Sequence, residues 1–198
     1  MMLENTAFSA FLERFPEDVQ LILREMIPSY QQGYLDYVYQ TDKPEIQARR
    51  IKNLVKNFRM MDYTFVMSLP QDLALEIVSD WQYPPGFTEL LDPIQSELLD
   101  AEAREGRDFA VILNGRLLGH FRLDKTDKGM LLYLALKPKY IGQGWGPRFY
   151  QTIEDFLVKQ GKIRQITVMS RITYHQVFFQ NQGFEKTSDM DPYLVKSL

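Results

Sequence analysis

The stretch Leu134-Ala135-Leu136-Lys137-Pro138-Lys139-Tyr140-Ile141-Gly142-Gln143-Gly144-Trp145-Gly146-Pro147 joins an apolar, strand-like run to an amphipathic helix. Three glycines at alternate positions stand at the junction. Glycine lets a backbone turn tightly and approach a ligand closely. The free N–H groups at a helix N-terminus, together with the helix dipole, favour an anion such as phosphate. The stretch therefore predicts a phosphate-binding turn.

Two familiar phosphate loops do not fit this stretch. The dinucleotide fingerprint needs G-x-G-x-x-G, and here Gly146 and Pro147 follow Gly144, so the third glycine is misplaced. The Walker pattern needs Gly-Lys followed by Ser or Thr, which is absent. A glycine-rich turn that binds no ligand stays as the simpler alternative.

The sequence before the glycines predicts three antiparallel strands. Residues 109–113 and 117–123 flank Asn114-Gly115, a pair that favours a tight hairpin because both residues accept positive φ. A second turn at 127–129 leads into a strand at 130–136. Pro138 ends that strand, since proline cannot donate to a ladder.

The elements further out follow from periodicity and from glycine and proline positions. After the glycines, a helix closes at Gly161, and a strand (163–169), a helix (171–182, closed by Gly183) and a final pair of strands within 184–198 follow. Before the hairpins we expect a strand at 63–69 and helices at 71–81 and 87–103. The first 60 residues read as four helices. Pro16 begins the second, Pro28 stops it, and Thr41 or Asp42 caps the fourth.

Composition narrows the class of protein. The chain has 198 residues, 45% of them hydrophobic, a formal net charge of −3 and no cysteine. The charge argues against a nucleic-acid partner, and the missing cysteines exclude disulfides and thiolate metal sites. No run is long enough to span a bilayer, and the N-terminus lacks the pattern of a signal peptide. We expect a cytoplasmic protein with no metal and no membrane partner.

The glycine stretch and the segment Phe178-Phe179-Gln180-Asn181-Gln182-Gly183-Phe184, which closes a helix in Gly-Phe, occur in the order and spacing of the GNAT superfamily of N-acetyltransferases. Residues 62–198 or thereabouts resemble that family. The resemblance implies an α/β (α+β) fold with a mixed, mostly antiparallel central sheet flanked by helices. We therefore expect an N-terminal helical region (1–60) followed by an acetyltransferase domain (61–198).

The resemblance also implies a reaction, the transfer of an acetyl group from acetyl-CoA to a primary amine of a small molecule or protein. The pyrophosphate would lie on residues 141–146 and the pantetheine arm along the preceding strand. The implied contacts are Leu134, Ala135, Leu136, Ile141, Gly142, Gln143, Gly144, Trp145, Gly146 and Phe179. The alternative is a module that binds CoA, or a protein partner, without catalysis.

Three positions depart from the family pattern. Ile141 stands where the family usually has Arg or Gln, so only backbone N–H groups remain for phosphate. Ile172 replaces the Asn that usually begins the closing helix. Phe179 replaces a Tyr that often protonates the departing CoA thiolate, which a phenyl ring cannot do.

Catalytic candidates are few. His120 can accept a proton at neutral pH, although a lone strand histidine is more often a surface or core residue. Tyr133 could protonate sulfur if it points into the cleft, and Ser170 could touch CoA, but packing and helix capping are the simpler roles. We expect His175, in the closing helix, to be exposed or capping.

The acceptor site and the N-terminal helices carry weaker signals. Tyr83, Phe87 and Glu89 are expected to line the acceptor site, with Trp81 and Tyr83 as core anchors in the alternative reading. Residues 30–58 resemble the helical tail of the bacteriocin-protection, OmpD-associated family, and the tyrosine-rich helices suit a homodimer surface. The basic face at 49–59 reads as a solvated face, with an acidic partner as the alternative.

Overall fold

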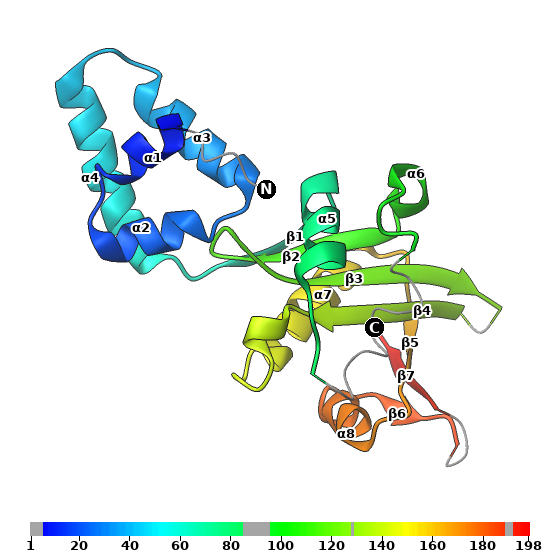
Figure 1. The fold of residues 1–198 in the computed structure, drawn as a ribbon. Coiled ribbons are helices and arrows are strands. Elements are labelled where there is room, and N and C mark those ends of the chain that lie inside the picture. The colour runs from blue at the N-terminus through cyan, green and yellow to red at the C-terminus, as the bar shows by residue number, and fades with distance from the viewer. Residues whose placement is uncertain (1–5, 85–95, 128, 189–191) are drawn as a thin grey trace. The chain divides into compact units, whose positions relative to one another are not determined.

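The computed structural model describes residues 6–84, 96–127, 129–188 and 192–198, and the chain forms two compact units (Figure 1). The first comprises Met1–Tyr63 together with Leu113–Leu117, and the second comprises Thr64–Ile112 with Leu118–Leu198.

The first unit is helical and has its own core. Its elements are α1 (Thr6–Leu12), α2 (Glu17–Arg24), α3 (Pro28–Tyr39) and α4 (Pro44–Met60). Their apolar stripes meet in one buried cluster, because each helix has a face that must leave water. The buried members are Phe11, Leu12, Phe15, Val19, Leu23, Met26, Val38, Ile51, Leu54 and Phe58.

Two helix boundaries differ from the sequence-based expectation. Helix α2 ends at Arg24, and Pro28 begins α3 instead of stopping α2. Proline suits the first helical position, where its missing N–H would find no partner. Neither Thr41 nor Asp42 caps α4; the N-cap is Lys43, and it makes no side-chain capping bond. Pro44 removes one of the N–H groups that such a cap would satisfy.

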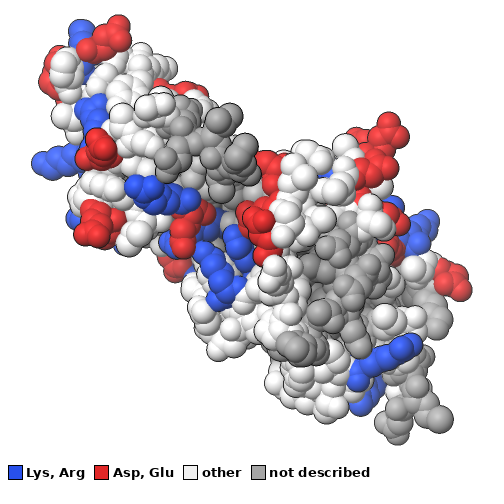
Figure 2. Space-filling model, viewed as in Figure 1, with Lys and Arg blue, Asp and Glu red and all other residues white. Residues whose placement is uncertain are grey.

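The basic face of α4 is partly engaged inside the helical unit. Arg59 pairs with Asp18 at 2.8 Å. Arg50 donates to the backbone carbonyl of Tyr37, and its guanidinium lies over the Tyr37 ring. On the face drawn in Figure 2, the described Lys and Arg side chains alternate with Asp and Glu, and no single-sign patch covers that view.

The second unit is built on a seven-stranded sheet in the order β1-β2-β3-β4-β5-β7-β6. Pairs β3–β4, β5–β7 and β6–β7 are antiparallel, and β4–β5 is parallel. The predicted mixed, mostly antiparallel sheet is thus confirmed. The strands are β1 (Thr64–Ser68), β2 (Asp108–Leu113), β3 (Arg116–Thr126), β4 (Gly129–Leu136), β5 (Gln165–Met169), β6 (Glu185–Lys186) and β7 (Tyr193–Ser197).

Helices flank this sheet (Figure 1): α5 (Gln71–Asp80), α6 (Ala101–Arg104), α7 (Gly146–Gln160) and α8 (Thr173–Asn181). Helix α7 covers the face that carries Gly119 and Phe121, since the Phe121 and Phe156 rings lie 6.0 Å apart. Its end at Gly161, with φ 63°, is as predicted.

The helix expected at 87–103 is wrong in its C-terminal part. Residues 85–95, with Phe87 and Glu89, lie outside the described residues. Beyond them a turn at 96–99 precedes Asp100, whose carboxylate accepts from the N–H groups of Glu102 and Ala103 and so begins a separate short helix, α6. Asp competes for nearby backbone N–H groups and therefore favours helix starts over interiors.

The predicted hairpin between β2 and β3 is present, with Asn114 at φ 50° and Gly115 at φ 75°. In the second predicted turn Lys128 lies outside the described residues, and Thr126 pairs with Gly129 across it. The β2–β3 tip packs within the helical unit. The Asn114 side chain accepts from the Tyr63 N–H at 2.9 Å and donates to the Met61 carbonyl at 3.1 Å.

Candidate active site

Strands β4 and β5 diverge toward the end of β4. Strand β4 pairs with β3 over its whole length, up to Gly119↔Leu136, whereas the described pairing with β5 covers only Met130↔Ile166 and Leu131↔Thr167. The N–H of Lys137 donates to the Leu118 carbonyl on β3. Because backbone groups alternate in direction along a strand, those of Leu134 and Leu136 face the gap.

The glycine stretch forms an open turn at the end of β4. A short 3₁₀ helix, η2 (Pro138–Tyr140), leads into it. The Ile141 and Gln143 N–H groups donate to the carbonyls of Pro138 and Tyr140. Gly142 (φ 73°) and Gly144 (φ 81°) both have positive φ, and a Cβ at either would meet nothing within 4 Å. The turn thus has open space beside it.

Several backbone N–H groups in this turn are available to a ligand. Within the described part of the chain, no hydrogen bond uses the N–H of Gly142, Gly144, Trp145 or Gly146. Gly146 begins α7, a helix of 15 residues. Its first-turn N–H groups and its dipole together favour an anion.

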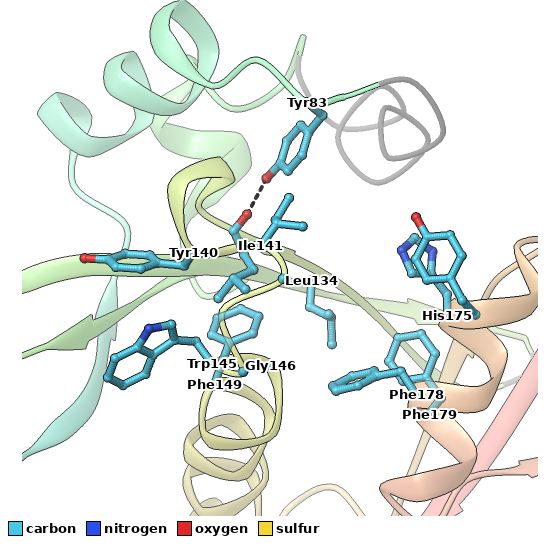
Figure 3. A pocket seen from close by; sticks show the side chains of 14 residues that line it. Tyr83, Leu134, Tyr140, Ile141, Trp145, Gly146, Phe149, His175, Phe178 and Phe179 are labelled. Atoms are coloured by element: carbon cyan, nitrogen blue, oxygen red, sulfur yellow. Dashed lines mark hydrogen bonds between the residues drawn. The ribbon is translucent and has the colours of Figure 1, made fainter.

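A cavity of about 200 Å³ lies beside the turn (Figure 3). Its walls come from the end of β4, the glycine turn, the start of α7 and one face of α8, with Tyr83 at the rim, and they are almost entirely apolar. The lining residues are Tyr83, Leu134, Leu136, Tyr140, Ile141, Gly142, Gly144, Trp145, Gly146, Phe149, Tyr174, His175, Phe178 and Phe179.

Tyr83, which precedes the glycine turn in the sequence, is hydrogen-bonded to the end of β4. Its hydroxyl donates to the Leu136 carbonyl at 2.8 Å (Figure 3). Burial raises the pKa of this hydroxyl well above its usual range. The Trp81 ring packs edge-on against Tyr83, with 6.3 Å between centroids. Tyr83 therefore anchors the end of β4 and lines this cavity, and its place in an acceptor site stays a prediction.

The sequence matches the family model described as an acetyltransferase (GNAT) domain over residues 82–192. This chain belongs to the GNAT acetyltransferase family. The match spans β2 to β6, the glycine turn and α8, and it ends just before β7; it contains every residue that lines the cavity.

Solved structures share the GNAT fold. The aminoglycoside acetyltransferase AAC(6')-Ib in complex with coenzyme A has a TM-score of 0.52 at 13% identity, covering 68% of this chain and 95% of that chain. The same enzyme in complex with paromomycin and acetyl-CoA has a TM-score of 0.53 at 14% identity, covering 69% and 94%. A GNAT acetyltransferase from Bacillus anthracis has a TM-score of 0.51 at 14% identity, covering 69% and 96%.

None of the curated proteins matches the sequence. The resemblance suggested for the N-terminal helices has no support from these comparisons, because the family model begins at residue 82. No described helix is both long and apolar enough to cross a membrane, and the described residues hold no group of three His, Cys, Asp or Glu arranged for a metal ion.

Most of the residues that the resemblance assigned to CoA meet at the GNAT cavity. Leu134, Leu136 and Phe179 line it, as do Ile141, Gly142, Gly144, Trp145 and Gly146. Two do not. Ala135 is buried beside β3, paired with His120. The Gln143 side chain instead donates to the Lys139 carbonyl at 2.6 Å.

The cavity also contains residues that sequence reasoning did not assign to it. Tyr140, Phe149, Tyr174, His175 and Phe178 complete the walls. His175, expected to be exposed or capping, faces the cavity instead. The spacing of His175 and Phe179, four residues apart on one helix, was the signal that would have placed them together.

His120 does not line the cavity; it lies in a buried polar cluster on the sheet face opposite Phe121. Its Nε2 is 2.8 Å from Asp108 Oδ1. The Arg122 guanidinium holds both oxygens of the same carboxylate and also reaches Glu97. Burial lowers the pKa of His120, against the opposing effect of Asp108. A catalytic role for His120 stays a hypothesis, and it would require the buried imidazole to reach the substrate.

The other two catalytic candidates also lie outside the cavity walls. Tyr133 is half-buried and shares the face of Arg122, its partner across β3–β4. Burial and the nearby Asp124 carboxylate raise the pKa of its hydroxyl. Ser170 is buried, and its Oγ accepts from the Ile172 N–H at 3.3 Å at the start of α8. Their catalytic roles stay predictions.

Proposed function

We propose that this GNAT protein transfers the acetyl group of acetyl-CoA to a primary amine of a small molecule or a protein. One observation carries the proposal. The available N–H groups of the glycine turn, at the start of α7, lie beside the open edge of β4 and share one apolar cavity with it.

The turn suits a diphosphate. Four N–H groups, those of Gly142, Gly144, Trp145 and Gly146, lack acceptors within the described residues. Gly142 and Gly144 carry no side chain, and the space where a Cβ would lie is open, so a ligand can approach the backbone closely. Ile141 contributes no charge, so binding would rest on backbone N–H groups and the α7 dipole.

The edge of β4 suits the pantetheine arm and the thioester. Acetyl-CoA supplies an activated acetyl group, and the Leu134 N–H would polarise its carbonyl in the manner of an oxyanion hole. The Leu136 carbonyl is held by the Tyr83 hydroxyl, so the arm would compete with Tyr83 for this group. The apolar walls exclude water, which would strengthen both interactions.

The acceptor amine needs little more than correct placement. Holding amine and thioester together is worth roughly 7–11 kcal/mol in well-oriented systems. His120 stays a candidate for a general base, a contribution of about 10²–10⁴-fold. Tyr133 stays a candidate to protonate the sulfur, and Ser170 a candidate to touch CoA. AAC(6')-Ib, which shares the fold, is named for aminoglycosides, and a small-molecule amine is the acceptor we propose to test first.

Thermal unfolding with CoA tests binding. A ligand that binds only the folded state stabilises it by about 2.7 kcal/mol at one hundred times its Kd, so CoA should raise the melting temperature. Acetyl-CoA consumption with a panel of primary amines then tests catalysis. An unchanged melting temperature with CoA and acetyl-CoA would overturn the proposal.

A second function is a GNAT module that binds CoA without transferring acetyl groups, either as a sensor or for a protein partner. Phe179 favours it, because the cavity wall has a phenyl ring where the family commonly has a proton donor. A melting shift with CoA, combined with no acetyl-CoA turnover across the amine panel, would select this alternative.

A further inference from the structure

Transfer of an acetyl group from CoA leaves a thiolate, which needs a proton. Phe179 lines the cavity but has no proton to give. The polar groups among the described lining residues are the hydroxyls of Tyr83, Tyr140 and Tyr174, the indole of Trp145 and the imidazole of His175. Within the described part of the chain, these five groups are the candidates for the donor.

Three of these groups are poorly placed. The Tyr83 proton is donated to the Leu136 carbonyl. Figure 3 shows the Tyr140 hydroxyl and the Trp145 indole directed away from Leu134 and from α8. The two remaining groups, on Tyr174 and His175, both come from the first half of α8.

His175 is better suited than Tyr174. It lies one helical turn before Phe179 on the same face of α8, and both side chains line the cavity. His175 can therefore place a proton donor beside the position where Phe179 has none. Figure 3 places it across the cavity from Leu134 of β4. Tyr174 is 47% exposed, and its ring packs edge-on against His175 at 4.3 Å. An imidazolium is also a stronger acid than a phenol, with an ordinary pKa of about 6.5 against about 10.

We propose that His175 is the acid that protonates the departing CoA thiolate, in place of the hydroxyl that position 179 lacks. This inference rests on the proposed function. The amine nitrogen bonds to the acetyl carbon, the carbon–sulfur bond breaks, and the sulfur takes its electron pair. The imidazolium of His175 gives a proton to that sulfur, and the amine releases one proton to solvent. Solvent then reprotonates His175, leaving an amide and CoA thiol.

The chain has only two histidines, which makes the test simple. Protein labelled with ¹⁵N-histidine should give two imidazoles, and H175Q assigns them. Each is titrated by NMR alone, with CoA, and with desulfo-CoA, which lacks only the sulfur. Bound CoA presents a thiol, and a hydrogen bond from its S–H to the imidazole favours the neutral form of the ring. We expect CoA to lower the titration midpoint of His175 by about half a unit, roughly a threefold change in proton affinity.

Desulfo-CoA should bind but leave the midpoint nearly where it is in the free protein, and His120, held by Asp108, serves as the internal reference. Equal midpoints with CoA and desulfo-CoA, while both raise the melting temperature, would overturn the role of His175 and leave the proposed function intact. If neither compound alters the melting temperature, the proposed function fails first.

Discussion

Gly144 is the residue at which the proposed CoA site can be tested most directly. Its φ of 81° and the empty space around it mean that a longer side chain would enter the anion site. We predict that G144E abolishes the melting shift produced by CoA, because its carboxylate would occupy and repel the phosphate position. The shift itself, measured by thermal unfolding, is the readout.

Gly106 offers the matched control. It too has positive φ (69°) and open surroundings, but it precedes β2 and does not line the cavity. G106E adds the same strain and the same charge, and it should keep the CoA shift. Loss of the shift in both variants, or in neither, would contradict the assignment of the glycine turn.

Gly119 matters for packing. A Cβ there would lie 2.4 Å from a Phe149 ring carbon and 2.7 Å from the Ala135 carbonyl oxygen. We predict that G119A lowers the free energy of unfolding by about 1–3 kcal/mol, the usual cost of overpacking a core, as measured by urea denaturation. G33A, in the interior of α3 with nothing within 4 Å, should instead stabilise by about 0.5–1 kcal/mol.

His120 and Asp108 make stability depend on pH. Burial lowers the pKa of His120, so between that value and about 6.5, its ordinary value, the unfolded chain binds a proton that the folded chain does not. Stability should therefore fall as pH drops below about 6.5, by up to about 1.4 kcal/mol per pH unit from this one group. Urea denaturation at several pH values between 7.5 and 5 would measure the slope.

In the H120Q variant, the stability should depend less steeply on pH, because the contribution of His120 is lost. H175Q removes the chain's other histidine and serves as the matched control. Equal slopes in the wild type and H120Q would contradict this account. Asp108 acts in the same direction at lower pH. Burial favours its neutral form, but hydrogen bonds from His120 and Arg122 prevail and lower its pKa, so its stabilising effect is lost only in strong acid.

Among the elements, the turn of the β2–β3 hairpin reverses the chain and also makes side-chain hydrogen bonds to the segment before β1. Asn114 has positive φ, and its side chain bonds both Tyr63 N–H and the Met61 carbonyl. We predict that N114A costs about 1–3 kcal/mol, since alanine strains the turn and both side-chain hydrogen bonds to the backbone of Tyr63 and Met61 are lost. N114D keeps the acceptor but loses the donor, so urea denaturation should place it between N114A and wild type.

The cavity is likewise formed by the arrangement of several elements and not by single residues. Divergence of β4 from β5 frees one edge of β4, α7 aims its N-terminus at the turn, and α8 closes the other side. A Cβ on Gly146 would lie 3.1 Å from the Phe178 ring, so the start of α7 lies directly against α8. A larger residue there would narrow the cavity at the junction of the glycine turn and α7.

At the scale of the whole molecule, the two compact units should loosen separately. Leu12 is buried in the helical core and Leu157 in α7 of the GNAT domain, each at 1% exposure or less. The L12A substitution leaves a cavity and should lower the stability of the helical unit by about 2–5 kcal/mol. We predict that it speeds amide exchange in residues 6–63 and at the hairpin tip. L157A should do so in the GNAT sheet and in α7. Hydrogen exchange with mass spectrometry would distinguish them.

If both variants loosened the whole chain equally, the units would unfold as one. The domain division predicted at residue 60 would then not correspond to separate folding units. If exchange separates them, CoA should protect only the region that contains α7 and α8.

Much of the fold could be predicted because its signals are local. Asn114-Gly115 predicts the hairpin since positive φ is a property of those two residues, and Gly161 ends α7 for the same reason. The failures were local too. Pro28 reads equally well as the end of one helix or the start of the next, and Asp100 begins a helix in the middle of an apolar pattern.

The lining residues on β4 and in the glycine turn were mostly predicted from the sequence, whereas most of those on α8 were not. The order of strand, glycines and amphipathic helix is written along the chain, and it was enough to indicate an anion-binding turn and the GNAT family. Which strand edges stay unpaired, and which side chains meet across the resulting gap, depends on contacts between residues far apart in sequence. His120 looked available on its strand, yet folding buries it against Asp108 and Arg122. His175 looked peripheral, yet the packing of α8 beside α7 makes it part of the cavity wall. Periodicity reports only that a strand or helix has a buried face; the partner that covers that face is chosen by tertiary packing.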